Sequence, residues 1–185
     1  MNIVYGGTFN PPTLAHENIV KKLQKMFNPK NIIIVPTASN YTWKTIDSFK
    51  ERYNMCKIAF KGAIISDIEA SNKEYRGTLD TLNRLSEKYE AIYFCMGADN
   101  LVHIKKWINY ETLLKKYHFI IFKRDNIDID DFIKKELLDY KDKFIVVDFE
   151  NTISSSSFRK THDYSLLSND VKEYIIKNNL EDLYV

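Results

Sequence analysis

The chain has 185 residues, 44% of them hydrophobic and 28% charged, which is the composition of an ordinary globular protein. Its formal net charge of +2 is too small to indicate a nucleic-acid or membrane partner. No apolar run approaches the roughly 20 residues that cross a bilayer, and the N-terminus lacks the pattern of a secretory signal. We therefore expect a cytoplasmic protein, one domain over residues 1–185, and buried free thiols at the isolated Cys56 and Cys95.

Six apolar runs bounded by turn residues recur along the chain and predict β-strands. Several of them are β-branched and apolar on successive residues, which is typical of strands in a parallel sheet that is covered on both faces. The runs cover residues 2–5, 31–36, 63–68, 91–97, 118–122 and 144–149.

Helical patterns fill the gaps between these runs. One covers residues 15–27, and the next, over 49–60, follows a capping box made by Ser48 and Glu51. The helical part near the C-terminus, from about residue 154 to 185, is expected to pack on the same domain. The predicted N-caps are Ser48, Thr78 and Ser168.

Strand and helix thus alternate about every 30 residues, as in βαβ units. The predicted fold class is α/β, with a doubly wound, Rossmann-like parallel sheet of five to six strands and helices on both faces.

The turn after the first strand, GGTFNPPTLAH from Gly6 to His16, holds two of the chain's five glycines and two of its four prolines. Ligands of parallel α/β sheets bind at the carboxyl ends of strands. Gly6 and Gly7 remove side chains where a ligand would approach the backbone, and the helix start that follows attracts anions. The chain has no G-x-G-x-x-G after this strand and no P-loop, so dehydrogenases and P-loop enzymes lose support.

His16 has two interpretations at this position. Its place on the apolar side of a helix fits a core histidine, whereas the glycine turn and the Thr13 hydroxyl beside it favour a phosphate contact. The segment ISSSSFR, from Ile153 to Arg159, likewise fits a flexible turn when it is taken alone. Its place after the last strand favours hydroxyls and an arginine that hold a polyphosphate.

Together these two segments resemble the signatures of the nucleotidyltransferase superfamily, [H/T]-x-G-H after a G-[GS]-F/T-F-D-P turn, and I-S-S-[ST]-x-x-R. Thr13 to His16 form the first signature, with Ala15 where glycine is usual and Asn10 where aspartate is common. Ile153 to Arg159 form the second.

Three internal segments narrow the resemblance to the nicotinate-nucleotide adenylyltransferase family. GADNLVHIKKW, residues 97–107, resembles the family's G-A-D-x-L block that ends in tryptophan, and TLDTL, residues 78–82, matches a helix start. ERYNMCKIAF and IIFKR match its R-x-x-M helix and the arginine after its fifth strand. One position differs: Gly77 stands where the family usually has tyrosine, and Tyr75 lies two positions earlier.

The resemblance implies that ATP and nicotinate mononucleotide combine to give deamido-NAD and pyrophosphate, with Mg²⁺ bound mainly through the ATP phosphates and without a protein metal site. It implies catalytic roles for His16 and Thr13. The implied ATP-binding residues are Gly6, Gly7, Thr8, Phe9, His16, Ser154, Ser155, Ser156 and Arg159. The implied mononucleotide-binding residues are Lys44, Thr78, Asp80, Gly97, Asp99, Trp107 and Arg124.

Other interpretations stay open at this point. Trp107 also fits helix packing, Asp80 and Asp99 also fit helix capping, and for Arg52, which lies in an amphipathic helix, we favour a structural role. The alternative functions are a phosphopantetheine or nicotinamide-mononucleotide adenylyltransferase, or a non-catalytic nucleotide-binding module. The sequence predicts no nucleic-acid or membrane partner and leaves a homo-oligomer open.

Overall fold

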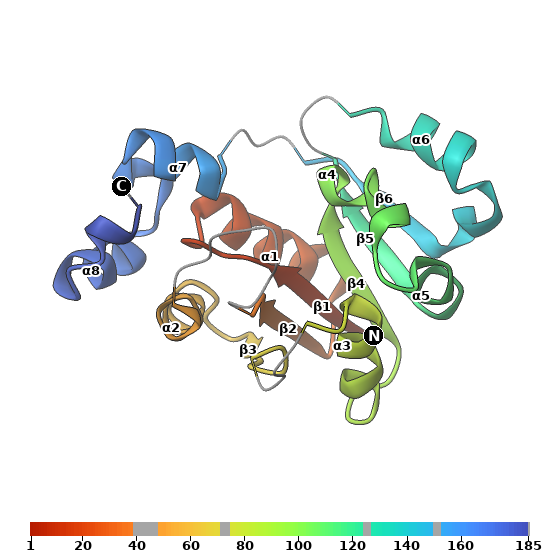
Figure 1. Cartoon of the computed structure of the whole chain (residues 1–185), viewed down its shortest axis with the longest axis horizontal. Helices are drawn as coiled ribbons and strands as arrows, with labels where there is room; N and C mark the ends of the chain where they lie inside the picture. The colour runs from red at the N-terminus through yellow and green to blue at the C-terminus, as the bar shows by residue number, and fades with distance from the viewer. Residues whose placement is uncertain (39–47, 71–74, 124–126, 150–152, 185) are drawn as a thin grey trace. The chain divides into compact units, whose positions relative to one another are not determined.

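The computed structural model describes the chain except for residues 39–47, 71–74, 124–126, 150–152 and 185 (Figure 1). The chain folds into two compact units. The first comprises Met1–Gly6 and Arg76–Thr152, and the second comprises Gly7–Tyr75 and Ile153–Val185. Among the described helices, none combines the length and the apolar character that a bilayer crossing requires.

The first unit contains four parallel strands in the order β1-β4-β5-β6. Because parallel strands cannot be joined by a tight hairpin, helices occupy the connections between them. The strands are β1 (Asn2–Gly7), β4 (Ile92–Gly97), β5 (His118–Phe122) and β6 (Phe144–Val147). The helices are α3 (Thr78–Ser86), α4 (Ala98–Leu101), α5 (Tyr110–Lys116) and α6 (Ile129–Glu136), with 3-10 turns at Ile104–Lys106 and Leu138–Lys143.

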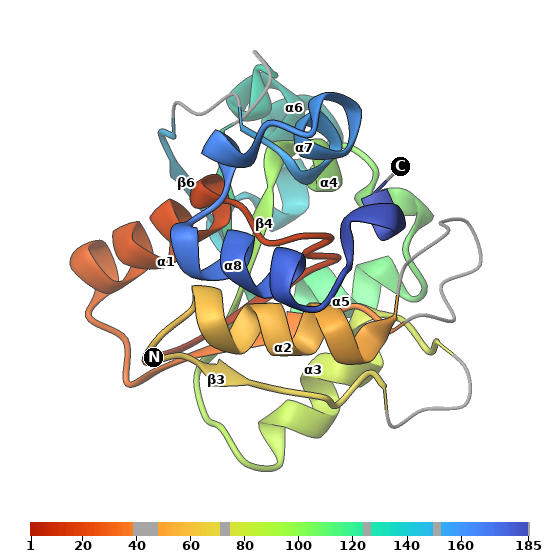
Figure 2. The ribbon, with the colours of Figure 1, turned by 90° about the vertical axis from the view of Figure 1, so that its left-hand side faces the viewer.

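The second unit carries a shorter parallel strand pair, in which Ile33 and Ile34 are in register with Ile64 and Ile65. Its elements are α1 (Leu14–Phe27), β2 (Asn31–Pro36), α2 (Phe49–Ala59), β3 (Ile64–Ile65), α7 (Ser155–Thr161) and α8 (Asn169–Lys177), with 3-10 turns at Tyr164–Leu166 and Glu181–Tyr184. Helix α8 lies alongside α2 (Figure 2).

Neighbouring residues within the strands are buried together, which explains their continuous apolar pattern. In β5, Ile120 and Ile121 are both 0% exposed, and in β2 the same holds for Ile33 and Ile34. Successive side chains of a strand point to opposite faces, so both faces of these strands are covered. The predicted α/β class and the six parallel strands are confirmed.

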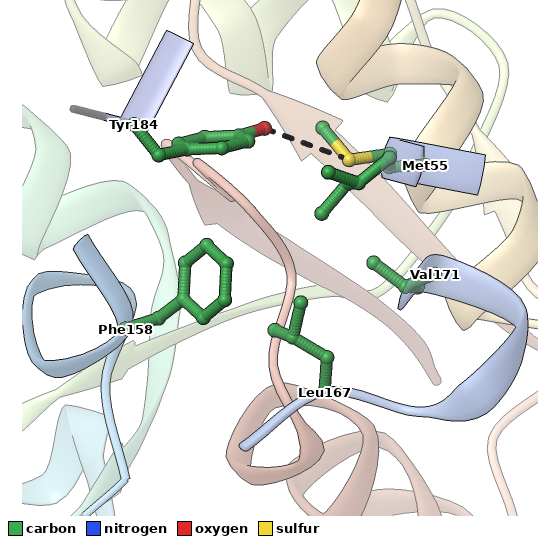
Figure 3. Packing of buried hydrophobic residues seen from close by; sticks show 6 residues of the cluster. Met55, Phe158, Leu167, Val171 and Tyr184 are labelled. Atoms are coloured by element: carbon green, nitrogen blue, oxygen red, sulfur yellow. Dashed lines mark hydrogen bonds between the residues drawn. The ribbon is translucent and has the colours of Figure 1, made fainter. Parts of the chain in front are cut away.

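A small apolar cluster holds the C-terminal part of the second unit together (Figure 3). Phe158 of α7 and Tyr184 pack edge to face, with ring centroids 5.5 Å apart. The Tyr184 hydroxyl donates to the sulfur of Met55 in α2 at 3.7 Å, and Nε2 of His162 lies 2.8 Å from the Tyr184 carbonyl oxygen. The last described turn of the chain is therefore fixed to both α2 and α7.

The structure corrects three predictions of local structure. The strand expected at 63–68 is reduced to Ile64–Ile65. Ser48 is the N-cap of α2, but its side chain makes no capping bond, and Glu51 accepts a hydrogen bond from Tyr174 of α8 at 2.7 Å. The N-cap of α3 is Gly77 and not Thr78, which is the first helical residue.

Three other predictions hold. Ser168 is the N-cap of α8. Cys56 and Cys95 are buried free cysteines, and burial raises the pKa of both thiols well above the ordinary range. These thiols are packing groups and not nucleophiles.

Candidate active site

The turn after β1 is packed from within by one phenylalanine. Phe9 is 1% exposed, and its backbone has φ 47°. A Cβ on Gly7 would lie 2.9 Å from the Phe9 ring, so only glycine leaves room for it. The same ring meets His16 and Phe60 edge to face, each at a centroid distance of 5.3 Å. Phe9 thus supports the imidazole of His16, while its own side chain has almost no surface to offer a ligand.

The geometry of a helix start explains the T-x-x-H spacing of Thr13 and His16. Thr13 is the N-cap of α1, and His16 is the third helical residue, the position from which a side chain reaches back to the cap. The Thr13 backbone N–H donates to Nδ1 of His16 at 3.0 Å, and the Thr13 hydroxyl lies 2.8 Å from the same nitrogen. The histidine therefore takes the place that glutamate or glutamine has in a common capping box.

This cap also determines which ring nitrogen of His16 carries the proton. A backbone N–H can only donate, so Nδ1 accepts and has no hydrogen of its own in this geometry. The ring N–H is then at Nε2. His16 is partly exposed whereas Thr13 is 0% exposed, so of the two the histidine has surface to offer a ligand and the threonine acts through the histidine.

The serine-rich segment is bonded directly to the first turn, although 144 residues separate the bonded pair. The Ser155 hydroxyl donates to the Pro11 carbonyl oxygen at 2.8 Å. Arg159 donates through Nη1 to the Asn10 carbonyl oxygen at 2.6 Å and through Nη2 to the Ser156 hydroxyl at 3.1 Å. The two motif segments are thus in direct contact in the folded chain.

Ser154 contributes differently from its neighbours. It is the N-cap of α7, and its hydroxyl oxygen accepts from the Ser157 backbone N–H at 3.0 Å. Ser156 is exposed, and Arg159 is partly exposed. A guanidinium has five N–H donors in a planar fork, and two described bonds leave it further donors for an anion. The arrangement combines a cation, hydroxyls and an imidazole N–H in one unit, which suits phosphate groups.

The first unit contains the other group of predicted residues. Trp107 is partly buried and meets Phe94 edge to face, with centroids 6.2 Å apart. A Cβ on Gly6 would lie 3.2 Å from the same Phe94 ring, so Phe94 lies next to both the glycine and the tryptophan. Trp107 thus makes a packing contact while part of its side chain stays exposed, so it fits both helix packing and stacking on a ligand ring.

Asp99 has one buried oxygen, Oδ1, without a hydrogen-bond partner in the described part of the chain. It lies in the first turn of α4, whose N-cap is Gly97, so Asp99 is not the cap residue. Asp80 lies in the first turn of α3, where a carboxylate suits the helix dipole. Thr78 is 8% exposed. Lys44 and Arg124 lie outside the described residues.

Sequence reasoning missed the groups that hold the site residues in place. These are the backbone carbonyl groups of Asn10 and Pro11, which accept from the serine-rich segment, and the ring of Phe60 against Phe9. Backbone acceptors leave no trace in a residue pattern, and an apolar ring resembles any other core residue. Within the described ranges, no group of three or more His, Cys, Asp or Glu side chains is placed to hold a metal ion.

A family model described as cytidylyltransferase-like matches residues 4–161 of the chain. A curated protein of Acholeplasma laidlawii (strain PG-8A), named as a probable nicotinate-nucleotide adenylyltransferase, is 38% identical over 97% of this chain and 97% of that protein. A protein of the same name from Fusobacterium nucleatum subsp. nucleatum is 33% identical over 96% of this chain and 98% of its own length. The chain belongs to the nicotinate-nucleotide adenylyltransferases of the cytidylyltransferase-like family.

Two solved structures with high similarity are of the Plasmodium falciparum nicotinic acid mononucleotide adenylyltransferase. The one complexed with NaAD has a TM-score of 0.83 and 27% identity, and the match covers 98% of this chain and 97% of that one. The one complexed with APC has a TM-score of 0.79 and 29% identity, with the same coverage. The fold of this family is thus the parallel α/β fold described above.

Proposed function

We propose that this member of the family transfers the adenylyl group of ATP to nicotinate mononucleotide, giving deamido-NAD and pyrophosphate in NAD biosynthesis. One observation carries the proposal. The Thr13–His16 cap and the Ser155–Arg159 segment are bonded to a single turn, and together they offer the donors that a polyphosphate requires. The names of the relatives and of the structural neighbours support nicotinate mononucleotide as the acceptor.

The reaction is an in-line displacement at phosphorus. A phosphate oxygen of the mononucleotide attacks the α-phosphorus of ATP, and the bond from that phosphorus to the bridging oxygen breaks as pyrophosphate leaves. Such a step needs alignment and charge stabilisation and no covalent protein nucleophile. In our proposal the Nε2–H of His16 donates to the α-phosphoryl oxygen as its negative charge grows.

The leaving group is held by the serine-rich segment in the same proposal. Ser156 and Arg159 contact the β- and γ-phosphates through their side chains. Ser155 contributes its backbone N–H, because its hydroxyl hydrogen is donated to Pro11, while Ser154 keeps α7 capped. Gly6, Gly7 and Thr8 line the turn through their backbone. Mg²⁺ enters with ATP as part of the substrate, bound to phosphate oxygens, and it offsets negative charge there.

Most of the mononucleotide contacts are assigned to the first unit, and Lys44 belongs to the second. Trp107 stacks on the pyridine ring. The Thr78 end of α3 supplies N–H groups to the nicotinate carboxylate, and Asp99 accepts from a ribose hydroxyl. Asp80, Gly97, Lys44 and Arg124 remain predicted contacts. A cytoplasmic location and the absence of nucleic-acid partners also remain predictions, and the oligomeric state is open.

Pyrophosphate release tests this function most directly. The purified chain is incubated with ATP, Mg²⁺ and, in separate reactions, nicotinate mononucleotide, nicotinamide mononucleotide or phosphopantetheine. We expect the fastest release with nicotinate mononucleotide, and no release when ATP or Mg²⁺ is omitted. Faster release with either of the other two acceptors would replace the proposed substrate. ATP binding by calorimetry without release from any acceptor would instead indicate a non-catalytic module.

A further inference from the structure

Arg52 is the largest fully buried side chain in the described chain, at 0% exposure. It lies in the first turns of α2, and its guanidinium makes two short hydrogen bonds to backbone oxygens. Nη1 donates to the Thr8 carbonyl at 2.8 Å, and Nη2 donates to the Thr37 carbonyl at 2.6 Å. A cation without surface exposure is rare in proteins and costly to desolvate.

The two acceptors belong to two loops of the second unit that are also joined to each other. Thr8 follows Gly7 at the end of β1, and Thr37 follows the end of β2. The Thr37 backbone N–H donates to the Gly7 carbonyl oxygen at 2.9 Å. One guanidinium fork therefore spans both loops where their backbones already touch.

Helix α2 supports the same turn at its other end. Phe60 is the C-cap of α2, and its ring meets the Phe9 ring, which in turn meets His16. Arg52 fixes the residue before Phe9, and Phe60 fixes the ring of Phe9. A displacement of α2 or a loss of the Arg52 bonds would therefore move the support beneath His16.

We propose that Arg52 is a positioning residue for adenylyl transfer. It holds the Thr8 and Thr37 carbonyl groups so that the Gly7–Phe9 backbone and His16 keep the arrangement that the ATP phosphates require. The inference rests on the proposed function for its kinetic part only. Lysine cannot replace this role fully, because an ammonium is a point charge and not a planar fork that reaches two acceptors.

A merely structural role for Arg52 would act through the packing of α2, and the chain offers a matched control for that. On another side of α2, Tyr174 of α8 donates to Glu51 at 2.7 Å and accepts from Asn54 at 3.1 Å. Tyr174→Phe removes both bonds and weakens the α2–α8 packing. It leaves the Thr8 and Thr37 contacts of Arg52 in place.

The experiment compares the wild type with Arg52→Met, Arg52→Lys and Tyr174→Phe. For each protein we measure Tm, then kcat and both KM values at the same interval below its own Tm. Arg52→Met should lower kcat about 100-fold, the scale of a small misplacement of reacting groups. Arg52→Lys should recover part of that loss, and Tyr174→Phe should lower Tm while kcat stays within about threefold of the wild type.

Hydrogen exchange provides a readout that does not depend on the substrate assignment. The Thr37 amide should exchange faster in Arg52→Lys and Arg52→Met and should keep its protection in Tyr174→Phe. If Arg52→Met does not fold, kcat and Thr37 exchange are measured on Arg52→Lys alone. Wild-type protein that releases no pyrophosphate would overturn the proposed function, while the exchange result would still decide the role of Arg52. Unchanged Thr37 exchange, or a kcat loss equal to that of Tyr174→Phe, would overturn the positioning role.

Discussion

The two units hold their candidate residues in different ways. In the second unit, the residues assigned to ATP are bonded to one another: Thr13 to His16, Ser155 to Pro11, and Arg159 to Asn10. In the first unit, the described residues assigned to the mononucleotide lie at helix starts and loops, and Trp107 makes a ring contact with Phe94.

The difference follows from what each substrate part needs. Phosphate oxygens accept directed hydrogen bonds, so the donors must be fixed before the substrate arrives. A pyridine ring needs a flat apolar surface, which one aromatic side chain can provide with less directional precision. We therefore expect substitutions in the second unit to change turnover and substitutions in the first unit to change mononucleotide affinity.

The largest effect is expected for His16→Ala. Loss of the Nε2–H donor should lower kcat by about three orders of magnitude, because a transition-state donor is removed, while ATP affinity changes less. Pyrophosphate release and calorimetry with ATP measure the two quantities. His103→Ala, at an exposed histidine of the first unit, is the control and should keep its turnover. An unchanged rate in His16→Ala would return His16 to a packing role.

Trp107→Ala should affect the binding of the mononucleotide and not the binding of ATP. Removal of the stacking surface should weaken mononucleotide binding about tenfold and leave ATP binding nearly unchanged. Trp107→Phe should lose much less mononucleotide affinity, since phenylalanine keeps an aromatic ring. Calorimetry with each substrate separately measures the two affinities. If both substrates are weakened equally, Trp107 holds the fold of the first unit and does not contact a ligand.

A pair of glycines, one in each unit, sharpens the comparison of their packing. Gly62 has φ 86° and Gly77 has φ 89°, but a Cβ on Gly62 meets nothing within 4 Å, whereas one on Gly77 lies 3.0 Å from Cβ of Ile108. Gly62→Ala should cost about 1 kcal/mol of unfolding free energy from its backbone conformation. Gly77→Ala should cost about 3 kcal/mol, since crowding adds to the strain. Equal losses in urea unfolding would contradict the role of Ile108.

The smallest effect is a pH dependence at Tyr174. Burial and then the hydrogen bond to Glu51 raise the pKa of Tyr174 above its ordinary value of 10.0. The folded state therefore binds this proton more tightly than the unfolded state, and the stabilisation is complete below about pH 10 and is lost as the pH rises through the folded pKa. The difference in unfolding free energy between the wild type and Tyr174→Phe should shrink above about pH 10. A constant difference would contradict this coupling.

Much of the fold could be predicted because local patterns determine it. The strand at residues 118–122 is apolar on successive positions, and its bounds agree with the structure. The helix at 110–116 was missed, because it has only seven residues. Its two buried leucines are adjacent and do not show the spacing by which an amphipathic helix is recognised. The capping box of Ser48 and Glu51 was wrong: Ser48 makes no capping bond, and Glu51 accepts from Tyr174, a contact over 123 residues that no local pattern records.

In the candidate site, too, local features could be predicted and long-range contacts could not. The T-x-x-H spacing is local, and the cap that it forms could be expected from helix geometry. The bonds from Arg52 to Thr8 and Thr37 could not, because backbone oxygens accept them and the chain must fold before they meet. Lys44 and Arg124, assigned from resemblance, remain predictions.

The orientation of the His16 ring has a practical consequence for inhibitor chemistry. With Nδ1 occupied by the Thr13 amide, a compound designed for this face encounters an N–H and not a lone pair. Fragments ending in sulfonate, tetrazolate or carbonyl oxygen would complement it, whereas amine or amidine heads would place one hydrogen against another. A screening library for this protein should therefore be weighted toward acceptor-bearing fragments.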